Sequence, residues 1–134
     1  MTEREKELKQ EYKRRPATIG VFQIRNTTND KILIASGHDL SGIMNRHRFQ
    51  LQNAIHPNST LQNDWQLFGA EKFAFEILEE LQPSDPQLDL AKELEFMEDM
   101  WLARLRPFGE RGYNQPKLSR AEKLRRIASR RVDS

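Results

Sequence analysis

Hydrophobic and polar residues alternate in two stretches near the start of the chain, and a polar turn separates them. Residues 18–26 and 31–36 each follow a period of two, which is typical of half-buried β-strands. The five residues between the apolar runs are Asn26, Thr27, Thr28, Asn29 and Asp30, and Asn and Asp tolerate the positive φ angles of tight turns. The pattern predicts an antiparallel hairpin of strands 18–26 and 31–36.

Two helices are predicted after this hairpin. Asp39 is a suitable N-cap for a helix that runs to about Asn53, with apolar side chains at i, i+3, i+4, i+7 and i+11 on one face. Asn58 or Ser59 is predicted to cap a second helix, which ends at Gly69.

The alternation returns after Gly69, and a long helix is predicted after that. Residues 73–78 read as a third strand, and the apolar spacing of residues 87–105 predicts a long helix that ends before Pro107. The order β-β-α-α-β-α predicts a mixed α/β (α+β) domain with a small three-stranded antiparallel sheet flanked by helices. We place this domain at residues 16–116, between an N-terminal helical arm (1–15) and a C-terminal helix (117–134).

Charge is distributed unevenly over these three parts. The formal net charge is +2 for the whole chain, with +2 on residues 1–15, −5 on residues 16–116 and +5 on residues 117–134. The cations of the last part are Lys117, Arg120, Lys123, Arg125, Arg126, Arg130 and Arg131. Lysine and arginine bind nucleic-acid phosphates without regard to sequence, so this segment is the candidate nucleic-acid contact, although a solvated helix face explains the charge equally well.

Several classes of protein are excluded by composition. The chain has no cysteine, which excludes a disulfide scaffold, a zinc ribbon and a thiol nucleophile. No apolar run approaches the roughly 18 to 20 residues that a membrane-spanning helix needs, and the charged N-terminal sequence lacks a secretory apolar region. We therefore expect a cytoplasmic protein without a membrane segment.

Two polar residues lie within apolar helix faces. Glu98 falls among Leu94, Trp101 and Leu105 on the predicted long helix, so its carboxylate needs a hydrogen-bond partner, a cation or a metal ion. His47 falls on the apolar face of the first helix, where a core histidine with a hydrogen-bond partner is the simpler interpretation and a ligand is the alternative.

Six blocks in this order resemble the GIY-YIG endonuclease superfamily over about residues 18–115. They are residues 20–26 (GVFQIRN), 29–36 (NDKILIAS), 61–65 (LQNDW), 73–78 (FAFEIL), 98–102 (EDMWL) and 112–114 (GYN). The resemblance implies a nuclease fold in which one divalent metal, one arginine and two tyrosines act on a phosphodiester. It places Phe22 and Leu33 at the tyrosine positions and Ile43 at the arginine position.

Only part of the family's catalytic set is retained. Glu98 matches the metal-binding glutamate and Asn114 a C-terminal asparagine, with His47 as a companion on the first helix. The resemblance thus implies Mg²⁺ or Mn²⁺ at Glu98 and a degenerate site. We expect a catalytically impaired protein that binds nucleic acid, such as DNA, mainly through its C-terminal helix. The alternatives are a protein-interaction unit whose terminal helices bind a partner or a second copy, and a weak metal-dependent endonuclease using Glu98.

Overall fold

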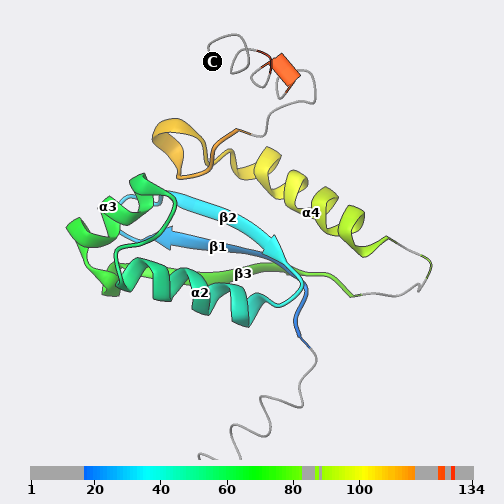
Figure 1. The fold of residues 1–134 in the computed structure, drawn as a ribbon, viewed down its shortest axis with the longest axis horizontal. Coiled ribbons are helices and arrows are strands. Elements are labelled where there is room, and N and C mark those ends of the chain that lie inside the picture. Colours follow the sequence, from blue (N-terminus) through cyan, green and yellow to red (C-terminus); the bar gives the residue numbers. More distant parts are fainter. Residues whose placement is uncertain (1–16, 83–86, 88, 117–123, 126–127, 129–134) are drawn as a thin grey trace, which may run out of the picture.

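A three-stranded antiparallel sheet with helices on both faces forms the body of the protein (Figure 1). The computed structural model describes residues 17–82, 87, 89–116, 124, 125 and 128. In chain order the elements are β1 (Gly20–Asn26), β2 (Ile32–Gly37), α2 (Leu40–Gln52), α3 (Ser59–Phe68), η1 (Ala70–Lys72), β3 (Phe73–Glu80), α4 (Leu90–Leu105) and η2 (Gly109–Arg111). The predicted fold class and the order β-β-α-α-β-α are confirmed.

The hairpin forms as the alternation predicts. β1 pairs with β2 from Gly20 opposite Gly37 to Arg25 opposite Ile32, and β3 pairs with the other edge of β1, so the strand order is β2-β1-β3. In the turn, the Asn26 side chain accepts a hydrogen bond from the Thr28 amide at 3.0 Å, and Asp30 has φ 62°. The turn therefore relies on the ability of Asn and Asp to bond locally and to adopt positive φ.

The caps of the two middle helices agree with the sequence. The Asp39 side chain accepts a hydrogen bond from Gly42 N at 3.2 Å, and that of Asn58 accepts one from Leu61 N at 3.0 Å. Gly69 follows α3 with φ 94°, a conformation that glycine adopts without strain. These contacts satisfy amide groups that the first helical turn leaves unbonded.

The long helix starts later than the predicted position 87. It begins at Leu90, because the Asp89 side chain accepts hydrogen bonds from Ala91 N at 3.1 Å and Lys92 N at 3.3 Å. Gln87 lies in a turn before this cap. The predicted start at residue 87 was wrong. It followed the apolar spacing, whereas the capping aspartate, Asp89, is the better signal for the N-terminus of a helix.

Two separate hydrophobic clusters cover the two faces of the sheet. Phe22 and Ile24 of β1 pack with Leu40 and Leu51 of α2, and with α3, on one face. Val21 of β1, Ile32 and Ile34 of β2 and Leu94 and Leu102 of α4 form the other. Figure 1 shows α2 and α4 on opposite faces of the sheet. The side chains of successive residues of β2 therefore lie on different faces of the sheet and in different clusters.

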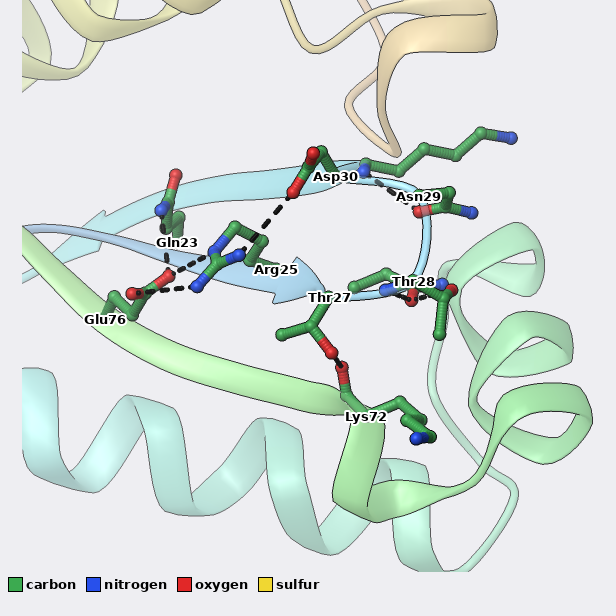
Figure 2. A network of polar contacts seen from close by, with 10 residues as sticks. Gln23, Arg25, Thr27, Thr28, Asn29, Asp30, Lys72 and Glu76 are labelled. Atoms are coloured by element: carbon green, nitrogen blue, oxygen red, sulfur yellow. Dashed lines mark hydrogen bonds and ion pairs between the residues drawn. The ribbon is translucent and has the colours of Figure 1, made fainter.

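An ion-pair network lies beside the hairpin turn (Figure 2). Arg25 Nε donates to Glu76 Oε1 at 2.7 Å, its Nη1 lies 3.5 Å from Asp30 Oδ1, and Gln23 Nε2 donates to the same oxygen of Glu76 at 3.1 Å. The hydrogen bond and charge of Glu76 raise the pKa of Arg25, and the bond from Arg25 lowers the pKa of Glu76. Arg25 is a cation with two carboxylates already beside it.

The predicted arm (1–15) and most of the C-terminal helix lie outside the described residues, so both stay predictions. Of the seven C-terminal cations, Arg125 is described, and it is exposed. Within the described residues, none of the helices combines the length and the apolar character that crossing a bilayer requires.

Candidate functional site

Strand β2 separates the candidate residues into two groups. Leu33 and Ala35 pack against the cluster beneath α2, whereas Ile34 belongs to the cluster beneath α4. Ser36 shares the side of Ile34 because side chains alternate along a strand. The site residues predicted from the sequence thus divide between the α2 side and the α4 side of β2.

The α2 side holds the three apolar candidates. Phe22 is fully buried, stands opposite Ala35 in the β1–β2 register, and packs in the same cluster as Leu33 and Ile43. Ile43 lies directly over Gly37, where an added methyl group would overlap its Cδ1 atom. These three side chains form a hydrocarbon surface and contribute no hydrogen-bond donor.

His47 lies beside this surface and pairs with a second histidine. Its Nδ1 atom is 2.7 Å from Nε2 of His56, and its ring stands edge-on to Phe22 with the centroids 5.7 Å apart. The amide of Asn58 donates to Nδ1 of His56 at 3.0 Å, so a neutral His56 carries its proton on Nε2. That proton is donated to Nδ1 of His47, which leaves the proton of a neutral His47 on Nε2.

The protonation of this pair is disfavoured. Burial, the neighbouring His56 and Arg46 together lower the pKa of His47 to about 4, and burial also lowers the pKa of His56. His47 thus has the hydrogen-bond partner that its simpler interpretation requires, and its role as a ligand stays a prediction. The role of His56 was missed, since it follows α2 in a loop and only the folded chain returns it to His47.

The pair predicts a loss of stability in mild acid. The unfolded chain takes up protons near pH 6.5 whereas the folded pair resists them, so stability is full above that value and falls as the pH drops toward 4. After allowance for partial exposure, we expect about 1 kcal/mol less free energy of unfolding at pH 5.5 than at pH 7.5, measured by urea titration.

Two variants serve as comparisons for this pH effect. His47→Gln keeps an acceptor for His56 and should reduce the difference between the two pH values. His38→Gln removes an exposed histidine ahead of α2 and should leave the difference unchanged. An unaltered pH difference in His47→Gln would contradict the prediction.

The α4 side holds Glu98. Its Oε2 atom accepts a 2.6 Å hydrogen bond from the hydroxyl of Ser36, near the end of β2. The prediction that Glu98 needs a polar partner is confirmed, and Ser36 is a site residue that the sequence reasoning missed.

Asn114 lies on the free edge of the same strand. Its Oδ1 accepts from Ile34 N at 2.7 Å and its Nδ2 donates to Ile34 O at 2.9 Å. One position earlier, Tyr113 N donates to Ile32 O at 2.9 Å. Residues 112–114 therefore run along β2 like a short extra strand, and they satisfy backbone groups that an edge strand would otherwise expose.

Tyr113 is the centre of a buried polar network. Its hydroxyl accepts from Asn26 Nδ2 at 3.2 Å and donates to Asp64 Oδ2 at 2.7 Å, and its carbonyl accepts from Asn58 Nδ2 at 2.6 Å. Burial raises the pKa of this phenol, so it stays protonated at neutral pH. Tyr113 connects the hairpin turn, α3 and the C-terminal loop. It lies on neither β1 nor β2, the strands on which the family resemblance implies tyrosines.

The described residues offer little for a resident metal ion. Among them, no group of three or more His, Asp or Glu side chains is arranged to hold one. Magnesium is often held by one or two carboxylates together with waters and substrate phosphates. Glu98 therefore fits Mg²⁺ or Mn²⁺ only as one ligand beside phosphate and water, and this role stays a prediction.

Two solved structures have a similar arrangement of elements. The catalytic domain of the homing endonuclease I-TevI matches with a TM-score of 0.61 and 28% sequence identity, over 74% of this chain and 99% of that one. A mutant of the catalytic domain of the intron endonuclease I-TevI matches with a TM-score of 0.62 and 25% sequence identity. This match covers 76% of this chain and 97% of that one. No family model and no curated protein matches the chain.

The chain has a GIY-YIG-like fold. The resemblance found in the sequence is thereby confirmed for the fold. With the GIY-YIG frame in place, Phe22, Leu33, Ile43 and His47 gather on the α2 side of β2, and Glu98 and Asn114 lie on its other side or edge. The catalytic and metal-binding roles assigned to these positions stay predictions.

Proposed function

We propose that this protein is a catalytically impaired GIY-YIG-like protein that binds nucleic acid, mainly through its basic C-terminal segment. The observation that carries the proposal is the apolar surface formed by Phe22, Leu33 and Ile43, with Phe22 fully buried. At these positions the family resemblance implies two tyrosines and an arginine. Hydrocarbon side chains can neither move a proton nor stabilise charge on a phosphate.

The size of the expected loss supports impairment. Removing one donor that stabilises a transition state typically costs about 10²- to 10³-fold in rate. Three such losses do not simply add, but they affect both the activation of water and the binding of the phosphate. Apart from these apolar positions, Glu98 and Ser36 supply a carboxylate and a hydroxyl.

Charge favours the C-terminal segment as the main contact. Residues 117–134 carry +5, whereas residues 16–116 carry −5 and repel a polyanion on average. Asn114 fixes the chain to β2 shortly before this segment begins. A nucleic acid held by the segment is therefore held close to the domain.

Binding is tested with the full chain and a chain that ends at residue 116. We expect the full chain to bind a labelled oligonucleotide in an anisotropy assay at 50 mM salt, and to weaken steeply as salt increases, because phosphate contacts release counterions. Deleting residues 117–134 should reduce the affinity by at least about tenfold. Absence of salt-dependent binding by the full chain would overturn the proposal.

Catalytic impairment is tested with the full chain in a plasmid-nicking assay. Supercoiled plasmid incubated with the protein and Mg²⁺ or Mn²⁺ should remain uncut. Nicking that disappears in Glu98→Ala would instead support the alternative of a weak metal-dependent endonuclease. Nicking that persists in Glu98→Ala would identify a contaminant and leave the expected result in place.

One observation favours the protein-interaction alternative. Phe96 and Met100, one turn apart on α4, are 65% and 57% exposed, an apolar pair of the kind that marks contact surfaces when it belongs to a larger patch. Concentration-dependent sedimentation together with absent nucleic-acid binding would favour this function over the proposed one.

A further inference from the structure

The two helical layers of the domain differ in charge. The helix α4 carries four carboxylates against Lys92 and Arg104, whereas α2 carries Arg46 and Arg48 and no carboxylate. The two layers cover opposite faces of the sheet (Figure 1). The residues of α4 therefore carry a net charge of −2 and those of α2 a net charge of +2, so α2 offers a polyanion a helix without carboxylates of its own.

The outer face of α2 carries side chains suited to bases and phosphates. Asn45, Arg46, Phe49 and Gln52 recur at helical spacing and are all exposed, with Phe49 59% accessible. Arginine binds phosphates, amide side chains bond to base edges, and an exposed aromatic ring stacks on an unpaired base. More than half of the Phe49 side chain is accessible to solvent, so its ring is available for contact with a ligand.

Arg48 is held beside this face. Its guanidinium lies 4.4 Å from the centre of the Phe75 ring on β3, and its Nη1 is 3.4 Å from Asn45 Oδ1. Within the part of the chain that the structure describes, neither Arg46 nor Arg48 forms an ion pair, in contrast to Arg25, which has two carboxylates beside it. Arg48 is therefore a positioned cation whose charge is not neutralised by those contacts.

We propose that the outer face of α2, formed by Asn45, Arg46, Arg48, Phe49 and Gln52, binds single-stranded nucleic acid, with Phe49 stacked on a base and Arg46 on a phosphate. This inference rests on the proposed function and adds a second contact surface within the domain. A single strand fits better than a duplex because a ring can stack only on a base that is free of its neighbours.

The test compares matched substitutions on the two opposite helices. In the full chain, Phe49→Ala and Arg46→Ala should each weaken binding of a labelled single-stranded oligonucleotide, by about tenfold for the ring. Arg46→Ala should also lower the slope of log affinity against log salt by about 0.7, as expected for one phosphate contact. Phe96→Ala and Arg104→Ala on the acidic helix are the controls and should leave the affinity within twofold.

The outcomes separate this inference from the proposed function. If the full chain does not bind at all, both fail. If it binds and loses affinity on deletion of residues 117–134, but Phe49→Ala and Arg46→Ala match the controls, only the α2 surface is overturned. A duplex of the same sequence tests the stacking step, because an equal loss with duplex and single strand in Phe49→Ala would overturn the preference for a single strand.

Discussion

Replacing Phe22 by alanine is expected to lower the free energy of unfolding by about 3 to 5 kcal/mol. Phe22 is fully buried between the sheet and α2, with Leu40 and Leu51 in the same cluster and the His47 ring against its edge. Truncation removes the transfer free energy of the ring and leaves a cavity that a closely packed core fills poorly. Urea titration at pH 7.5 measures the change.

Phe49→Ala is the matched control for this core position. The two substitutions remove the same atoms, but Phe49 is 59% exposed, so its loss should cost no more than about 0.5 kcal/mol. A small cost for Phe22→Ala would contradict the assignment of this family position to the core. A large cost for Phe49→Ala would show that the ring supports the fold, and would make it unsuitable for the binding test.

Asn26→Ala is expected to cost about 2 to 4 kcal/mol. Asn26 is fully buried, accepts from the Thr28 amide and donates to the Tyr113 hydroxyl, which itself bonds to Asp64. Alanine removes these bonds and leaves the buried Tyr113 hydroxyl without the Asn26 donor, and a buried polar group that loses its partner costs more than the bond contributes. The same urea titration gives the value.

Asn29→Ala is the comparison within the same turn. The Asn29 side chain accepts a hydrogen bond from Lys31 N at 3.0 Å and also interacts with Tyr113. Because Asn29 is exposed, water can replace these contacts, and its removal should cost at most about 1 kcal/mol. Equal costs for the two asparagines would show that the burial of the Asn26 bonds adds nothing to stability, and would contradict the prediction.

The elements of the fold were predictable because they rest on local signals. Alternation identified the strands, and the caps Asp39 and Asn58 and the terminator Gly69 marked where helices begin and end. The error at the start of α4 also concerns a local signal. The prediction followed the apolar spacing, although Asp89 is a stronger signal for where a helix begins.

The site was less predictable because its contacts are distant in the chain. Periodicity showed that Glu98 needed a partner, but the hydroxyl of Ser36 is 62 positions away in sequence. The pairing of His47 with His56, and the burial of Tyr113 beneath the hairpin, depend on loops that carry no periodic signal. The family resemblance assigned Glu98 a metal-binding role on the long helix, and the apolar residues around it indicated that it needs a polar partner, but neither identified Ser36.

The attachment of Asn114 to Ile34 also limits how far the basic segment can travel. Residue 117 follows this anchor by about 10 Å of extended chain, so the first cation of the segment starts within that reach of the edge of β2. Under the proposed function, a strand bound by the segment would meet the domain as an intramolecular partner, at an effective concentration on the order of millimolar. Even a weak second contact on the domain would be occupied under these conditions, and the two together would act with avidity.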